Sequence, residues 1–166
     1  IMGANGVIAL SIPVKKDRGK KNHLRDIRID YDTSWNKIHW RSLVASYATS
    51  PFFEYIADEL FPFYEKNFEF LIDLNHQLLE YTLGFLGLDA ELKYSEAFTP
   101  ISSEQDLRHF IHPKKDQAVA DPGFLPLEYH QVFSDRLSFR ANLSILDLIF
   151  NEGPDALTYL HRCLKT

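Results

Sequence analysis

The sequence predicts an α/β fold, a helix-rich layer structure with a small sheet, with an α+β arrangement as the alternative. Apolar residues recur at helical spacing through much of the chain, and short strand-like runs separate the helical segments. The chain has 166 residues, of which 45% are hydrophobic and 25% are charged. These proportions are typical of a soluble globular protein with one core. We therefore expect residues 1–166 to form a single domain.

Two strand-like runs near the N-terminus, residues 7–14 and 26–31, are joined by a basic segment. Residues 15–28 hold seven lysines and arginines against two aspartates, although the whole chain has a net charge of −5. A solvated loop explains this segment most simply, and binding of a phosphate, a sugar nucleotide or an anionic carrier is the alternative. Nucleic acid is not an expected partner, because residues 54–106 hold twelve acids against two lysines.

The middle of the chain has the pattern of three helices. The first begins after residues 32–34, which offer N-cap side chains, and extends for about four turns. The second restarts after the Ser-Pro pair at 50–51 and ends or kinks at Pro62, because proline fits only the first turn of a helix. The longest helix is expected over residues 66–86, with Gly87 as its C-cap.

The later part of the chain mixes shorter elements. Gly153 and Pro154 combine a helix stop with a helix start, so they divide the two helices that close the chain. The elements expected after the longest helix are strands at 91–95 and 127–133, a short helix ending near 111, and helices at 143–151 and 154–165.

One edge of the first predicted helix carries polar and aromatic side chains. Trp35, His39, Ser42 and Ser46 fall within about a quarter-turn of one another, apart from the core face and from the solvent face. This pattern is typical of a helix that lines a polar cleft. His39 is then a general base or a hydrogen-bond donor, since the pKa of an imidazole lies near neutrality. The alternative is a histidine satisfied by its neighbours at the edge of the core.

The predicted helix at 143–151 is apolar on nearly all sides, yet it contains Asp147. A buried carboxylate costs several kcal/mol of folding free energy unless donors surround it, so Asp147 must meet donors or a solvated pocket. Capping of a neighbouring element and a binding or catalytic role both satisfy this requirement.

A second group of cations lies near residue 110. Arg108, His112 and Lys114 lie at the end of the predicted short helix, where positive charge complements the helix dipole or clamps a phosphate or carboxylate. The seven histidines and the lone cysteine have no metal-site spacing, so we expect no metal. No apolar run is long enough to cross a bilayer and the first residues lack a secretory pattern, so we expect a cytoplasmic protein without a membrane span.

Taken together, several segments resemble the WbqC-like proteins of bacteria, and most closely the branch found in Bacteroidetes. The resemblance covers nearly the whole chain. Its segments are Gly3-Ala4-Asn5-Gly6, Leu10-Ser11-Ile12-Pro13-Val14, Ile29 to His39, Ala45-Ser46-Tyr47, Ser50-Pro51-Phe52-Phe53, Ile111-His112-Pro113-Lys114 and Asn142 to Asp147.

This resemblance implies an association with the assembly of surface polysaccharide, the O-antigen, but it names no reaction and no cofactor. Relatives carry a strand-turn-helix segment before the position of Ile1, so the chain is expected to be a fragment of the family domain. The family positions that correspond to Trp35, His39, Tyr47 and Asp147 fall on the polar edge of the first predicted helix and on the polar stripe Ser144, Asp147 and Asn151 of the helix at 143–151, which favours the interpretation of a site.

The leading hypothesis is a transferase that acts on a small-molecule substrate, a sugar nucleotide or a sugar amine. His39 and Asp147 are the expected catalytic pair. The expected substrate-binding residues are Trp35, Ser42, Tyr47, Arg108, His112, Lys114 and Tyr129. The alternative is a non-catalytic binding or scaffold protein of a glycan-assembly complex, with the aromatic segment 52–55 as its partner surface.

Overall fold

The computed structural model describes residues 1–15, 23–95, 97, 121 and 123–165. It confirms a helix-rich mixed fold with a small sheet. The sheet is an antiparallel hairpin of β1 (Met2–Gly3) and β2 (Gly6–Val7), in which Met2 faces Val7. Gly6 has a φ of 117°, which only glycine adopts without strain, so it allows the tight turn. None of the helices in the described ranges is long and apolar enough to cross a membrane.

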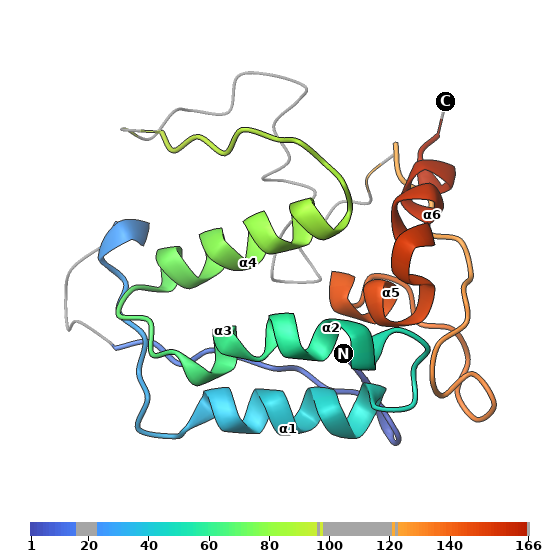
Figure 1. The fold of residues 1–166 in the computed structure, drawn as a ribbon, viewed down its shortest axis with the longest axis horizontal. Coiled ribbons are helices and arrows are strands. Elements are labelled where there is room, and N and C mark those ends of the chain that lie inside the picture. Colours follow the sequence, from blue (N-terminus) through green and yellow to red (C-terminus); the bar gives the residue numbers. More distant parts are fainter. Residues whose placement is uncertain (16–22, 96, 98–120, 122, 166) are drawn as a thin grey trace.

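The helices follow one another in a back-and-forth path (Figure 1). The helix α1 runs in one direction, α2 and the short α3 return beside it, and α4 runs forward again. At one end of these helices lie α5 and α6, next to the end of α1. The bounds are α1 (Trp35–Tyr47), α2 (Phe53–Leu60), α3 (Pro62–Glu65), α4 (Leu71–Phe85), α5 (Ile145–Glu152) and α6 (Ala156–Cys163), with 3-10 turns at Leu24–Asp26 and Gly153–Asp155.

Helix boundaries follow from residue types that the sequence shows. Pro62 opens α3 and separates it from α2, as expected for a residue that has no backbone N–H to donate. Ser144 is the N-cap of α5, and its Oγ accepts a hydrogen bond from the Leu146 amide at 3.3 Å. Gly153 ends α5 with a φ of 52° and Pro154 follows at once. The expected cap of α1 is different, because Ser34 has a left-handed backbone and makes no side-chain cap bond.

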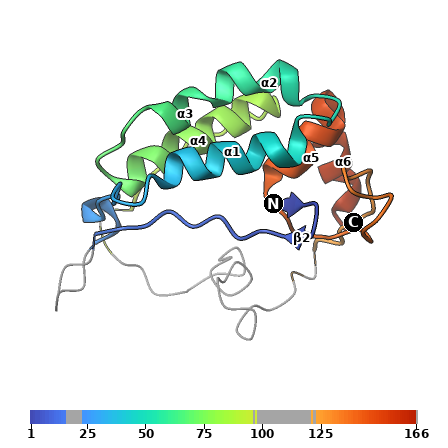
Figure 2. The same cartoon turned by 90° about the horizontal axis from the view of Figure 1, so that it is seen from below.

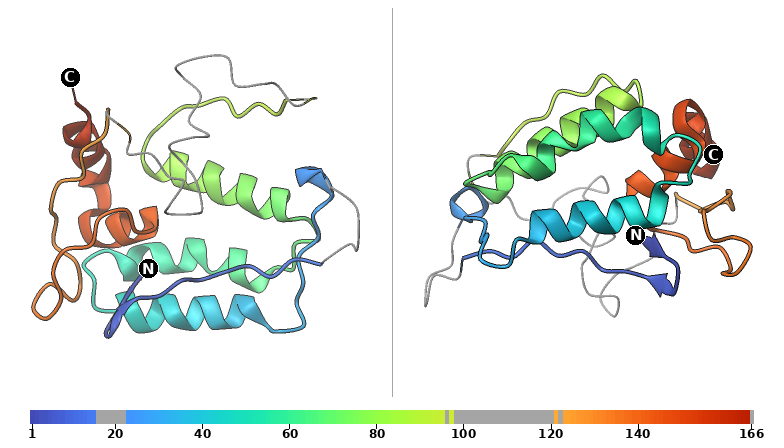
Figure 3. Two further views of the ribbon diagram at one scale, coloured as in Figure 1. Left: turned by 180° about the vertical axis from the view of Figure 1, so that it is seen from behind. Right: turned by 60° about the horizontal axis from the view of Figure 1, so that its bottom comes forward.

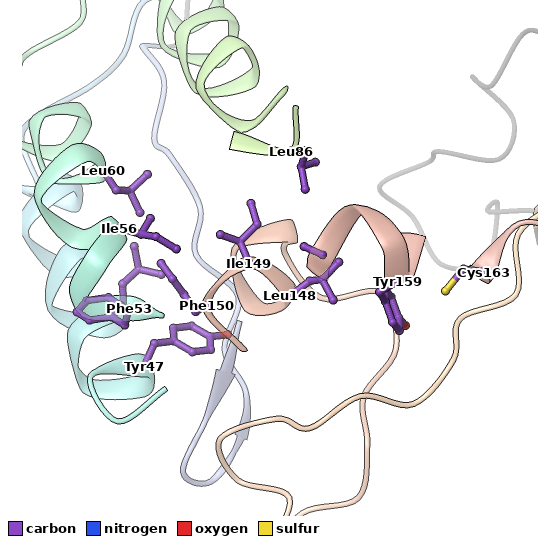
Figure 4. Packing of buried hydrophobic residues seen from close by; sticks show 12 residues of the cluster. Tyr47, Phe53, Ile56, Leu60, Leu86, Leu148, Ile149, Phe150, Tyr159 and Cys163 are labelled. Carbon is purple, nitrogen blue, oxygen red and sulfur yellow. The ribbon is translucent and has the colours of Figure 1, made fainter. Parts of the chain in front are cut away.

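The main hydrophobic core lies where α5 and α6 meet α1 and α2 (Figure 4). Leu43 and Tyr47 enter it from α1, while Ile149 and Phe150 enter it from α5 and have no exposed surface. Tyr47 and Phe53 both pack on Phe150, each with its ring centroid 5.0 Å away. Burying one such side chain contributes about 1.5–3 kcal/mol to the free energy of unfolding. The core therefore fixes the end of α1 against α5.

The longest predicted helix is shorter than expected at its start. Residues 67–70 are extended, because this stretch pairs with the segment 27–29 instead of continuing a helix. The Ile29 amide donates to the Glu69 carbonyl at 3.0 Å, and the Leu71 amide donates to the Ile27 carbonyl at 2.9 Å. The prediction of a helix from residue 66 was wrong, since pattern alone did not reveal this distant partner.

Two predicted strands do not form. Residues 127–133 are irregular, because the Gln131 amide donates to the Ser134 side chain at 2.9 Å and not to a neighbouring strand. Residues 91–95 are also irregular and mostly exposed. The run 7–14 contributes only its first residue to the sheet and then continues as an extended segment up to Val14, which bridges to Ile29. The predicted short helix near residue 111 lies outside the described residues.

The extended segment, residues 8–14, lies beside the candidate site. It runs along α1, as Figure 3 shows, and in the view of Figure 2 it lies below α1 while α2 and α3 lie above. The hydrogen bond between His39 and the Ser11 carbonyl holds it against the helix. The extended segment and α1 together form the walls of the site described below.

The turn between α5 and α6 predicts a strong effect of a small substitution. A Cβ atom at position 153 would lie 2.5 Å from the Phe52 ring, and the backbone there is left-handed. Gly153→Ala is therefore expected to lower the free energy of unfolding by more than about 1 kcal/mol. Gly84→Ala is the matched control, because open space surrounds that position and alanine favours a helix by about 1 kcal/mol. Urea denaturation showing equal effects would contradict this account of the turn.

Candidate functional site

Two hollows lie between the extended segment and the rest of the molecule. The Trp35 hollow, of about 320 Å³, is lined by Ala9, Leu10, Ser11, Pro13, Thr33, Trp35, Ile38 and His39. The Leu43 hollow, of about 440 Å³, is lined by Ile1, Val7, Ile8, Ala9, Leu10, Ile12, His39, Leu43, Tyr64, Leu78, Asn142, Leu143, Ser144 and Leu146. Both lists contain Ala9, Leu10 and His39, so His39 stands in a wall that the two hollows share.

His39 is held in one tautomer. Its Nε2 lies 3.2 Å from the Ser11 carbonyl oxygen, and a carbonyl only accepts, so Nε2 carries the proton and donates it. In the neutral ring the Nδ1 lone pair is then left to accept a proton. Burial lowers the pKa of His39 below its usual 6.5, and the weaker effect of the Ser11 bond opposes this. His39 is therefore a neutral proton acceptor near pH 7.

Trp35 supports His39 and leaves a donor without a partner. The two rings meet edge to face with their centroids 5.0 Å apart. Trp35 is 4% exposed, and its Nε1 makes no hydrogen bond within the described part of the chain. A buried donor without an acceptor costs about 1–3 kcal/mol. Trp35 also lines the Trp35 hollow beside His39.

Asp147 is the centre of a buried hydrogen-bond cluster. Its carboxylate, with 0% exposure, accepts from the Tyr47 hydroxyl at 2.7 Å and from the Tyr129 hydroxyl at 2.6 Å. The Gln131 side-chain amide adds a third donor at 3.2 Å. The Tyr47 hydroxyl accepts in turn from the Met2 amide at 3.1 Å. We call these four side chains, Asp147, Tyr47, Tyr129 and Gln131, the Asp147 cluster; it joins β1, α1, α5 and the segment around 130.

The hydroxyl groups of the cluster stay protonated. Burial raises the pKa of Tyr47 and of Tyr129 far above 10, and the negative charge of Asp147 adds to this effect. Both phenols therefore remain donors to the carboxylate at all physiological pH values. The chemistry of the cluster is that of a fixed structural anchor.

The two predicted catalytic residues, His39 and Asp147, form hydrogen bonds with different groups. No hydrogen bond links His39 with Asp147 in the described ranges, and Asp147 is absent from the linings of both hollows. The chain just before it, however, does reach the Leu43 hollow through Ser144. Helix α5 thus contributes a wall to the hollow while its carboxylate faces the cluster.

The other predicted residues lie in several places. Ser42 donates to the Ile38 carbonyl at 2.9 Å, within its own helix, and lines neither hollow. Tyr129 lines a third, mostly apolar hollow of about 190 Å³ together with Phe139 and Tyr159. Arg108, His112 and Lys114 lie outside the described residues. Three or more metal-binding side chains do not come together anywhere in the described ranges.

The aromatic segment 52–55, which was expected to form a partner surface, is partly buried in the core and partly exposed. Phe53 is buried in the core, whereas Tyr55 is 79% exposed. Phe52 packs against the core and against Gly153. Within this segment Glu54 and Tyr55 are therefore the exposed residues, which is a small surface for a partner.

Sequence reasoning missed two important groups. Gln131 fell in a presumed strand, and nothing in its neighbourhood indicated a contact with Asp147. Ser11 acts through its backbone carbonyl, which any residue type could supply. Gln131 follows His130 in a run of mixed polar and apolar residues, so no pattern in the sequence singled it out.

Comparison with known proteins gives a family and one distant relative. The model of the WbqC-like protein family matches residues 1–123. An uncharacterized protein of Mycobacterium tuberculosis, Rv1507c, is 28% identical, with 98% of this chain and 80% of that protein covered. No solved structure matches the chain.

The hydrogen bonds of the Asp147 cluster indicate that truncation of the Asp147 side chain will strongly destabilise the protein. Asp147→Ala removes the acceptor of three donors and leaves them buried, so we expect the free energy of unfolding to fall by about 3 kcal/mol. Asp135→Ala removes an exposed carboxylate and is expected to change it by less than about 0.5 kcal/mol. Urea denaturation measures both, and a small effect of the first variant would refute the anchoring role.

The low pKa of His39 predicts a dependence of stability on pH. The unfolded chain takes up a proton near pH 6.5 and the folded chain only at lower pH, so stability falls as pH drops through 6.5 towards the folded pKa. In His39→Gln the free energy of unfolding should therefore fall less than in the parent protein when the pH is lowered. Urea midpoints between about pH 7.5 and 5.5 measure this difference. His161→Gln, which removes a different imidazole on α6, is the control. Parallel curves for the parent and His39→Gln would count against a neutral buried His39.

Proposed function

The chain belongs to the WbqC-like protein family, and we propose that it is a cytoplasmic transferase of surface-glycan assembly that acts on a sugar nucleotide or a sugar amine. The pathway is supported by the association of this family with surface-polysaccharide genes. The kind of reaction is supported by the arrangement around His39. The two arguments are independent, because one concerns relatives and the other concerns geometry.

The shared wall of the two hollows carries the proposal. A transferase holds a donor and an acceptor at the same time, with a proton acceptor at the point where they meet. His39 lines both hollows, and its neutral Nδ1 has a lone pair. Each hollow is of the size of a small-molecule site. This arrangement favours group transfer over the binding of a single ligand.

The proposed step is general-base catalysis. The acceptor hydroxyl or amine forms a bond to the transferred sugar carbon while the bond from that carbon to the nucleotide phosphate breaks. The acceptor proton passes to Nδ1 of His39, and the nucleotide leaves with the bonding electron pair. The Ser11 carbonyl then faces an imidazolium ring and stabilises its positive charge. Such a base contributes about 10²–10⁴ in rate.

The neighbouring residues have supporting roles in this proposal. Trp35, which lines the Trp35 hollow, offers a flat ring for the sugar. Asp147 acts as a positioning residue, because its carboxylate touches the cluster and not the hollows. The positive charges of Arg108, His112 when protonated, and Lys114 suit the anionic leaving group, and this role stays a prediction from the sequence.

A ligand screen followed by turnover tests the proposal. Nucleotide sugars that bind should raise the melting temperature of the protein, since a ligand of the folded state stabilises it. For such a ligand, His39→Gln should lower kcat by about 10²-fold or more while the ligand-induced rise persists. The matched control is His161→Gln, in which kcat should stay unchanged.

Three outcomes would count against the transferase or against the role of His39 in it. Stabilisation by a nucleotide sugar with no turnover for any sugar acceptor would favour the alternative of a non-catalytic binding protein. Turnover that is unchanged in His39→Gln would place the reaction elsewhere in the molecule. A melting temperature that collapses in His39→Gln, with kcat retained in the folded fraction, would assign His39 to structure alone.

A further inference from the structure

A separate pocket lies on the other side of α1, against α3. We call it the Trp40 pocket; it has a volume of about 260 Å³. Its walls come from one stretch of α1 and from the bend between α2 and α3. The lining residues are Asn36, Lys37, Trp40, Arg41, Phe61, Tyr64 and Glu65.

The floor of the Trp40 pocket is aromatic. The ring centroid of Trp40 lies 5.0 Å from that of Phe61 and 5.6 Å from that of Tyr64. Phe61 is a large apolar residue with 38% of its surface exposed. The Asn36 side chain donates to the Tyr64 carbonyl at 2.8 Å, which fixes α1 against the end of α3. The result is a preformed surface on which a planar ring can stack.

The rim of the pocket carries two cations. Lys37 and Arg41 are four residues apart on α1, so their side chains share one stripe of the helix. Both are exposed, and neither forms an ion pair within the described part of the chain. Glu65 is the acid that lines the pocket, which leaves an excess of positive charge. Burial raises the pKa of Tyr64 to about 12, so its phenol adds no negative charge.

We propose that the Trp40 pocket binds a nucleoside phosphate. The base stacks on Trp40 and Phe61, and the phosphate is held by Arg41 and Lys37. A neutral sugar could use the aromatic floor but would leave both cations without a role. Inorganic phosphate could use the cations but would leave the floor uncovered. Only a ligand with a planar ring and an anionic group uses both features.

The lining of the Trp40 pocket shares no residue with that of the Trp35 hollow and shares Tyr64 with that of the Leu43 hollow, but neither His39 nor the extended segment lines the Trp40 pocket. Lys37 and Arg41 each stand two residues from His39, which is about 160° around the helix at 100° per residue. Figure 2 shows α1 between the extended segment on one side and α3 on the other. One nucleotide therefore cannot occupy the Trp40 pocket and reach His39 around the helix. The proposal is independent of the transferase reaction.

The two tryptophans of the chain allow a direct test, because each belongs to one site. Their indole N–H signals in a ¹⁵N–¹H spectrum of the full chain can be assigned with Trp35→Phe. Titration with AMP should shift the Trp40 signal to saturation. Adenosine and inorganic phosphate should each bind at least about tenfold more weakly, since each makes only part of the contacts.

Charge variants decide whether the pocket works as proposed. Arg41→Gln and Lys37→Gln should each raise the Kd for AMP, the first by about tenfold, because a charge-assisted hydrogen bond is lost. Arg136→Gln, an exposed cation elsewhere, should leave the Kd unchanged. Three results would overturn the proposal: a shift of the Trp35 signal alone, no shift of either signal up to about 10 mM AMP, or an unchanged Kd in both charge variants.

Discussion

The structure depends on a buried carboxylate that neutral donors surround. Asp147 accepts from Tyr47 on α1, and Tyr47 accepts from the amide of Met2 in β1. The same carboxylate accepts from Tyr129 and from Gln131, which in turn exchanges two hydrogen bonds with the backbone of Arg140. Four parts of the chain that are distant in sequence therefore meet at one charged group. Because β1 is anchored here, the extended segment that follows it starts at a fixed point beside α1.

The main effect of a buried carboxylate in this position is to select one arrangement of the surrounding chain segments. Its net contribution to the free energy of folding is smaller. Desolvation of a charge costs several kcal/mol, and three donors offset that cost only when all of them are in place. An apolar residue at position 147 could pack as tightly but would leave the hydroxyls of Tyr47 and Tyr129 without an acceptor. The cluster thus makes misplaced arrangements of β1 or of residues 129–131 expensive. The extended segment lines the hollows around His39, so their shape depends on a fixed position of its first residues.

Sequence patterns predicted the helices well and the pairing of extended segments poorly. The spacing of apolar residues located α1, α2, α5 and α6 to within a few residues, because each buries one face against the core. The start of α4 was missed, since residues 67–70 pair with a segment some forty residues earlier. Strand partners are set by long-range hydrogen bonds that a single sequence does not reveal. The same limit explains why Trp35 and His39 were recognised as one stripe while the Ser11 carbonyl was not.

Helix α1 also shows how one short element can serve several purposes at once. Leu43 and Tyr47 bind it to the core, His39 faces the extended segment, and Trp40 packs on Tyr64 of α3. A helix used on so many sides has little freedom to rotate or slide, because any such motion would disturb the core and the Asp147 cluster together. The imidazole of His39 is therefore presented by a rigid element, with a backbone carbonyl fixing its tautomer. General-base catalysis needs this pre-organisation, whereas a binding surface that adapts to partners does not.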